Sequence, residues 1–215
     1  MTSIAGVDEA GRGSVIGPLV VAGVLVDEGG LKALQRLGVK DSKLLTPERR
    51  RELSGKIKEV ALRYAYSELS PAQIDRVVLH GVKYRRLNYL EMVAMARIIE
   101  ELRPSKAIVD PCDVSPERCV REIQAMLPFK VEVLSERHAD RIYPVVSAAS
   151  ILAKVRRDER ISELRKRYGD LGSGYPSDPR TIRFLESLLK GGGECPPFVR
   201  VSWATVRRLR SLRQK

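Results

Sequence analysis

The feature that most constrains the fold is a short apolar run that ends on two adjacent carboxylates. Residues 4–7 are apolar or glycine, Asp8 and Glu9 follow, and residues 11–13 read Gly-Arg-Gly before a second apolar run at 15–26. Short apolar runs bounded by glycine are typical of buried strands. We therefore predict strand, turn, strand, with both acids at the end of the first strand. Because an isolated carboxylate is costly to bury, these acids need hydrogen bonds, a cation or a metal ion as partners.

The net charge of the chain points to a polyanionic partner. Lys and Arg number 39 and Asp and Glu number 27, which gives +12 over 215 residues. Such an excess favours nucleic acid, and the alternative is the solvated surface of a charge-rich, thermophilic protein. The length suits one good-sized core, in one domain with a small appendage.

Cysteine usage and hydropathy bear on the compartment. The three cysteines are Cys112, Cys119 and Cys195. They form no Cys-x-x-Cys pair, and with only two histidines in the chain we expect no zinc site. The odd count favours reduced thiols in a cytoplasmic protein, while a Cys112–Cys119 bridge stays open. Met1 leads directly into the first strand pattern, and no run is long and apolar enough to cross a membrane.

The order of the predicted elements defines an α/β fold with a mixed central sheet flanked by helices. Strands are predicted at residues 4–9, 15–26, 60–69, 106–110 and 129–134. Helices are predicted at 31–37, from 46, from 70, at 87–102, from 115, at 147–168, at 177–190 and after 202. The triple glycine at 191–193 divides the chain into a core, 1–190, and a helical C-terminal part, 191–215.

Acids follow apolar strands at three places, Asp8-Glu9, Asp110 and Asp140. Functional groups of α/β sheets collect at strand ends, and neighbouring strands would make these carboxylates converge. Oxygen ligands of this kind suit Mg²⁺, and two such ions favour in-line displacement at phosphorus. The alternative is that the acids cap helices or pair with arginines.

The Gly11-Arg12-Gly13 stretch allows close approach of the backbone to a ligand, because glycine has no side chain and adopts positive φ. Backbone groups there could contact a ribose 2′-hydroxyl, which distinguishes RNA from DNA. An ordinary tight turn is the alternative.

Several motifs together resemble those of ribonuclease HII, in order and over residues 4–205. They are GVDEAGRG at 6–13, IGPLV at 16–20, KDSK at 40–43, IVD at 108–110, HAD at 138–140, YPVV at 143–146, SAASILAKV at 147–155, GSGYPSD at 172–178 and RVSW at 200–203. The resemblance implies a ribonuclease H-like fold. It also implies a Mg²⁺- or Mn²⁺-dependent endonuclease that acts on RNA–DNA hybrids and on DNA duplexes containing ribonucleotides, cutting 5′ of the ribonucleotide with two metal ions and leaving 3′-hydroxyl and 5′-phosphate ends.

The resemblance also implies roles for individual residues. The catalytic, metal-binding acids are Asp8, Glu9, Asp110 and Asp140, with Asp8 bridging the metals. The substrate-binding residues are Gly11, Arg12 and Gly13 at the 2′-hydroxyl, Tyr175 stacked on a sugar, and Ser42 and Lys43 at phosphates. Tyr175 lies in a glycine-rich break, which favours a surface aromatic for stacking.

The long helix predicted from residue 147 carries one polar stripe, formed by Ser147, Ser150, Lys154 and Asp158. We hypothesise that this stripe faces the acids or the substrate, with Lys154 binding substrate. A solvated face is the alternative. Trp203 is expected in the core and His138 at the surface.

Two other functions stay open: a nucleic-acid-binding module without activity, and another nuclease of the same fold superfamily such as a junction resolvase. A sliding-clamp partner is doubtful, because residues 210–215 contain no aromatic of a clamp-binding tail. A monomer without membrane contact is expected.

Overall fold

The structure, a computed structural model, describes residues 2–39, 45–82, 86–190 and 194–212. Its sheet has the strand order β3-β2-β1-β4-β5. The strands are β1 (Ile4–Ala10), β2 (Leu19–Val26), β3 (Arg63–Leu69), β4 (Lys106–Val109) and β5 (Glu132–Ser135). β1 pairs antiparallel with β2 and parallel with β4, and β4 pairs parallel with β5. The predicted mixed sheet is therefore confirmed, although the second strand begins at Leu19 rather than at residue 15.

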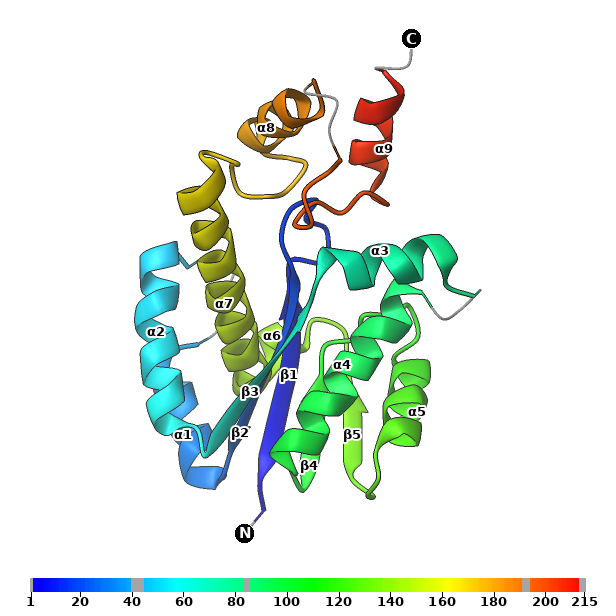
Figure 1. The fold of residues 1–215 in the computed structure, drawn as a ribbon. Helices are drawn as coiled ribbons and strands as arrows, with labels where there is room; N and C mark the ends of the chain where they lie inside the picture. The colour runs from blue at the N-terminus through cyan, green and yellow to red at the C-terminus, as the bar shows by residue number, and fades with distance from the viewer. Residues whose placement is uncertain (1, 40–44, 83–85, 191–193, 213–215) are drawn as a thin grey trace. The chain divides into compact units, whose positions relative to one another are not determined.

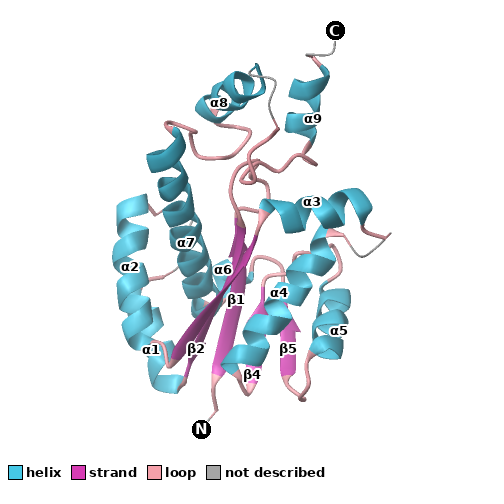
Figure 2. Cartoon of the chain, viewed as in Figure 1, coloured by secondary structure: helices cyan, strands magenta, loops and turns pink. Residues whose placement is uncertain are grey.

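Helices connect these strands and continue after the last of them (Figure 2). They are α1 (Glu28–Leu37), α2 (Pro47–Val60), α3 (Pro71–His80), α4 (Leu87–Leu102), α5 (Pro116–Met126), α6 (Ala139–Ile142), α7 (Pro144–Tyr168), α8 (Pro179–Lys190) and α9 (Ala204–Ser211). The short α6 was not predicted, because four residues are too few to show a helical period. In the described part of the chain, no helix combines the length and apolarity that crossing a membrane requires.

Helix starts follow local capping chemistry. Thr46 accepts a hydrogen bond from the backbone N–H of Arg49, and Ser70 forms a reciprocal capping box with Gln73. Ser115 caps α5 in the same way, and proline occupies the first turn of α2, α3 and α5. Proline suits that position because its missing N–H would have no partner inside the helix. These predicted helix starts are confirmed.

The chain forms two compact units. The first comprises Met1–Ala10, Val20–Ser67 and Asn88–Arg156, and the second comprises Gly11–Leu19, Glu68–Leu87 and Arg157–Lys215. Each has its own apolar core, around the sheet in the first unit and around Val15, Ile161 and Phe198 in the second. These boundaries differ from the predicted division after residue 190.

Helices pack on both faces of the sheet in the first unit. Gly6 and Gly23 point to opposite faces, because Gly23 pairs with Val7 in the β1–β2 register. A Cβ atom added at Gly6 would meet Val145 at the start of α7, whereas one at Gly23 would meet Ile98 of α4. Leu34 of α1, Ile57 of α2 and Ile151 of α7 belong to one core cluster, and Figure 1 shows these three helices on the left of the view. Alternate residues of β1 thus face α7 and α4.

We expect Gly6→Ala to destabilise the fold by about 3 kcal/mol, because its Cβ would stand 2.3 Å from the backbone carbonyl carbon of Val145. Gly55→Ala is the matched control. Gly55 lies inside α2, where no described atom comes within 4 Å of an added Cβ, so a gain of about 0.5–1 kcal/mol is expected. Urea unfolding of both variants measures the difference, and equal stabilities would contradict this packing of β1 on α7.

Candidate active site

Three of the four predicted acids come together in the first unit. The backbone N–H of Asp110 donates to the carbonyl of Val7 at 3.2 Å, which sets Asp110 beside Asp8 on the neighbouring strand end. Asp140 lies in α6 and is 4% exposed, and Asp8 is 7% exposed. Burial, and then the charge of Asp140, raise the pKa of Asp110. The carboxylate of Asp110 therefore lies within electrostatic range of both Asp8 and Asp140.

The carboxyl group of Asp8 has a strongly raised pKa. Its pKa is raised to about 7, mainly by burial and also by the nearby charge of Asp110, against the hydrogen bond from Ser150. The backbone N–H of Glu9 donates to Oδ1 of Asp8 at 2.8 Å. Lys154 lowers the same pKa by its charge, and its Nζ donates to Oγ of Ser150 at 2.9 Å. The predicted polar stripe thus faces the cluster at Ser150 and Lys154.

Glu9 points to the opposite face of the sheet from Asp8, because successive side chains of a strand alternate. Its charge acts on Cys112, whose pKa is raised first by a hydrogen bond with Cys119, then by burial and by the charges of Glu91 and Glu9. Glu91 belongs to α4 and is fully buried. Glu9 therefore lies on the α4 face, and its metal-binding role stays a prediction.

The acid cluster suits a hard divalent cation. Buried carboxylates that raise one another's pKa are stabilised by a cation between them, and all their donor atoms are oxygen. Within the ranges that the structure describes, however, no three His, Cys, Asp or Glu side chains are already arranged around one ion position. Asp8, Asp110 and Asp140 would hold the ion.

The pKa of Asp8 gives the fold a pH dependence. Its folded pKa of about 7 exceeds the ordinary value of 3.8, so ionisation of Asp8 opposes folding. The stability that protonated Asp8 contributes is complete below about pH 4 and is lost as the pH rises through 7. In chelator at pH 8, we expect Asp8→Asn to be more stable than the parent protein by a few kcal/mol. Thermal unfolding at pH 4 and pH 8 measures this, and a variant that is no more stable at pH 8 would contradict it.

The Gly11–Gly13 turn belongs to the second unit. Gly11 has a φ of 86°, and its carbonyl accepts hydrogen bonds from the backbone N–H and the Oγ of Ser14. Arg200 is fully buried and donates to the carbonyl of Arg12 at 2.9 Å and to that of Gly17 at 3.1 and 3.0 Å. Gly13 is exposed, and no atom of the described residues lies within 4 Å of a Cβ added there. The fold therefore requires glycine at 11 but not at 13.

Tyr175 also lies in the second unit, on a loop that two glycines shape. Gly172 and Gly174 have φ values of 67° and 79°. The guanidinium of Arg157 lies 4.4 Å from the centroid of the Tyr175 ring and donates to the carbonyl of Ser173 at 2.5 Å. Tyr175 is half-buried, so part of its side chain remains accessible to a ligand.

Other predicted positions have mixed outcomes. Ser42 and Lys43 lie outside the described residues. His138 is exposed, as expected, whereas Trp203 is only half-buried against the second core. Sequence reasoning missed the supporting roles of Arg157 and Arg200, because buried arginines look like surface charges in a basic sequence. Arg200 had one signal, its place in the RVSW motif.

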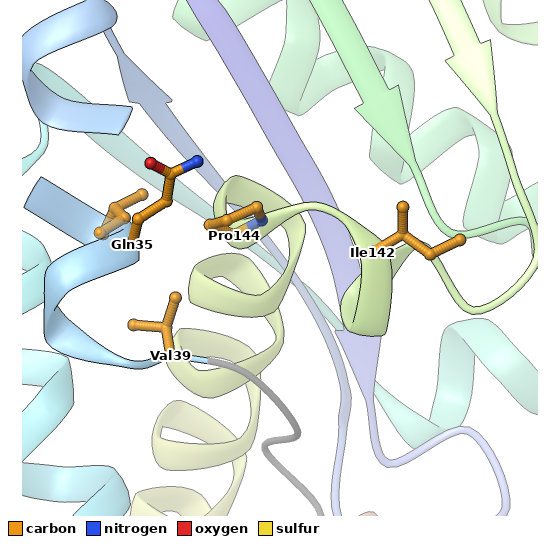
Figure 3. A pocket seen from close by; sticks show the side chains of 5 residues that line it. Gln35, Val39, Ile142 and Pro144 are labelled. Carbon is orange, nitrogen blue, oxygen red and sulfur yellow. The ribbon is translucent and has the colours of Figure 1, made fainter. Parts of the chain in front are cut away.

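A pocket of about 280 Å³ in the first unit lies next to α6. It is lined by Leu34, Gln35, Val39, Ile142 and Pro144. Figure 3 shows the labelled side chains, none of which is acidic. This mostly apolar pocket is therefore distinct from the carboxylate cluster.

A mixed sheet with carboxylates converging at adjacent strand ends defines a class of α/β proteins that use acidic clusters in catalysis. The family model for ribonuclease HII matches residues 5–206, and the chain belongs to the ribonuclease HII family. It is an endoribonuclease with ribonuclease activity on RNA–DNA hybrids.

Individual relatives agree with this membership. Ribonuclease HII of Methanothermobacter thermautotrophicus is 50% identical over 95% of this chain and 98% of its own length. The crystal structure of ribonuclease H2 from Pyrococcus horikoshii matches with a TM-score of 0.91 at 42% identity, covering 100% of both chains. Ribonuclease HII from Archaeoglobus fulgidus, solved in complex with PCNA, matches with a TM-score of 0.86 at 43% identity over 96% of both chains.

Proposed function

We propose that this endoribonuclease uses two Mg²⁺ or Mn²⁺ ions to cut on the 5′ side of ribonucleotides embedded in duplex DNA, as well as in longer hybrids. It leaves 3′-hydroxyl and 5′-phosphate ends. The observation that carries the proposal is the convergence of Asp8, Asp110 and Asp140, whose burial and mutual repulsion raise the pKa values of Asp8 and Asp110. Such a cluster beside a polyanion requires cations, and the protein has a net charge of +12 for binding that polyanion.

The acids have separate tasks in this proposal. Asp8 would serve both ions, Asp110 and Asp140 would each serve one, and Glu9 would be a further ligand. The bound cations supply charge stabilisation for in-line displacement at phosphorus. Ser150 and the backbone N–H of Glu9 orient the Asp8 carboxylate through hydrogen bonds. Lys154 binds a substrate phosphate next to the cluster.

Recognition of the ribonucleotide is assigned to the second unit. Backbone groups of Gly11, Arg12 and Gly13 contact the 2′-hydroxyl, and the ring of Tyr175 stacks on the sugar. The open space at Gly13 supports this, because a ligand can approach the backbone there. Ser42 and Lys43 hold backbone phosphates.

The test uses a DNA duplex with one ribonucleotide, labelled at the 5′ end of that strand. We expect one product ending in a 3′-hydroxyl with Mg²⁺ or Mn²⁺, and none with chelator. Binding without cutting under all conditions would favour the non-enzymatic binding module. Cleavage of an all-DNA four-way junction, but not of the ribonucleotide duplex, would favour a junction resolvase.

We expect Gly13→Ala to leave stability within about 0.5 kcal/mol of the parent, because its Cβ would enter open space. Cleavage of the single-ribonucleotide duplex should nevertheless fall by about tenfold or more, since the methyl group would keep the 2′-hydroxyl from the backbone. Gly11→Ala is the contrasting variant. Its φ of 86° and a Cβ only 2.8 Å from the carbonyl oxygen of Pro18 predict a loss of stability. Full activity of folded Gly13→Ala would count against the recognition role.

That the protein is a monomer and that it lies in the cytoplasm both remain predictions. The PCNA complex concerns the Archaeoglobus fulgidus protein. For this chain, weak or no binding to a sliding clamp stays a prediction. Titration with an archaeal sliding clamp tests this.

A further inference from the structure

Asp75 is a buried acid of α3 that has no part in the proposed reaction so far. It is 9% exposed. Its Oδ2 accepts a hydrogen bond from the backbone N–H of Val201 at 2.9 Å. Its Oδ1 accepts from the backbone N–H of Ser202 at 2.9 Å and from the Oγ of Ser202 at 2.5 Å. One side chain therefore holds the backbone of the two residues that directly follow Arg200.

The backbone before Val201 is held from another side. The backbone N–H of Arg200 donates to the carbonyl of Val15 at 2.9 Å, and Val199 forms an antiparallel bridge with Ile16. All of these residues, and Asp75 with them, belong to the second unit. The backbone of Arg200 is thus fixed from both directions, and this determines where its buried side chain can reach.

The side chain of Arg200 fixes the peptide bond between Arg12 and Gly13. Its Nη1 donates to the carbonyl of Arg12 at 2.9 Å. Among the described residues no peptide bond is cis, and in a trans peptide the C=O and the following N–H share a plane and point in opposite directions. Because the Arg12 carbonyl is turned toward Arg200, the N–H of Gly13 points away from it, on an exposed residue. The direction of this donor therefore depends on Arg200.

We propose that Asp75 is a positioning residue for recognition of the ribonucleotide, and that it acts through Arg200 on the backbone N–H of Gly13. The inference rests on the proposed contact between the Gly11–Gly13 turn and the 2′-hydroxyl. Asp75 does not touch the substrate in this arrangement: it holds the backbone that carries Arg200, and Arg200 holds the peptide bond that presents the donor.

The proposal separates the cleavage step from binding. A displaced Gly13 N–H leaves the 2′-hydroxyl without its partner and the neighbouring phosphate out of position, so the cleavage step becomes slower. Affinity for the duplex depends mainly on contacts between basic side chains and phosphates, which a change at Asp75 leaves in place. We therefore expect loss of the Asp75 carboxylate to lower the rate constant of cleavage and to leave duplex affinity nearly unchanged.

Asp75→Asn tests this, because asparagine has the same shape but replaces one acceptor oxygen with a donor that faces a backbone N–H. The duplex with one ribonucleotide is cleaved in a single turnover with Mg²⁺ and excess enzyme. Partial unfolding alone leaves the rate constant unchanged there, whereas a misplaced donor lowers it. We expect a fall of about fivefold or more, with affinity in chelator within about twofold of the parent. Ser202→Ala keeps both backbone hydrogen bonds to Asp75 and should stay within about twofold of the parent rate.

A double-mutant cycle with Gly13→Ala completes the design. The added methyl group already blocks the contact, so Asp75→Asn in that background should lower the rate constant by less than about twofold more. If Asp75→Asn fails to fold, Asp75→Glu, which displaces the carboxylate by one methylene, replaces it in the same cycle.

The outcomes separate this inference from the proposed function. Additive losses, or Asp75→Asn cleaving at the parent rate while Gly13→Ala is slow, would overturn the role of Asp75 and leave the proposed function standing. An equal loss in Ser202→Ala would also overturn it, because the backbone hydrogen bonds would then not be what positions Arg200. Full activity of folded Gly13→Ala would overturn the recognition role of the turn itself, and the role of Asp75 with it.

Discussion

Asp8→Asn is expected to lower the rate of ribonucleotide cleavage by at least about 10³-fold. The change is isosteric but removes the charge of a buried carboxylate, which interacts electrostatically with Asp110 and Lys154. Binding of the same duplex should stay within about threefold of the parent, because the positive surface that attracts phosphates is unchanged. Single-turnover cleavage with Mg²⁺ and fluorescence anisotropy in chelator measure the two quantities separately.

Asp27→Asn is the matched control for that loss. Asp27 caps α1 by accepting from the backbone N–H of Gly30 at 2.8 Å, and asparagine caps helices about as well as aspartate. It should therefore keep full activity. Cleavage by Asp8→Asn at the parent rate would show that the cluster does not hold the catalytic ions.

The largest loss of stability is expected for Arg200→Met, at about 3–5 kcal/mol. The side chain of Arg200 is fully buried, and its removal leaves the carbonyls of Gly17 and Arg12 without the hydrogen bonds that it donates. The guanidinium also packs 5.0 Å from the centroid of the Trp203 ring. Urea unfolding, followed by the fluorescence of this single tryptophan, reports on the second unit.

Arg208→Met provides the comparison for Arg200→Met. Arg208 is an exposed residue of α9, so its replacement should change stability by less than about 0.5 kcal/mol. If both variants unfolded at the same urea concentration, the Gly11–Gly13 turn would not depend on Arg200. A stable Arg200→Met protein with normal cleavage would also show that the turn does not depend on Arg200.

Local chemistry explains which elements could be predicted. Thr46, Ser70 and Ser115 start helices through hydrogen bonds to residues three positions ahead, so the sequence alone contains both partners. β1 was predictable because its apolar run and glycines are contiguous. Convergence of Asp8 with Asp110 followed from a general property of neighbouring strands, although their sequence separation exceeds 100 residues.

The amino-acid sequence by itself determined the helix caps, the strand-forming runs and the acids at their ends, because each depends on neighbours a few positions away. Only the tertiary structure decided that Arg200 supports the Gly11–Gly13 turn, since its acceptors lie 183 and 188 positions earlier in the chain. It likewise decided that Arg157 lies against Tyr175 and that Ser150 reaches Asp8. Partners of buried polar groups are chosen by packing across the whole fold, which no local pattern encodes.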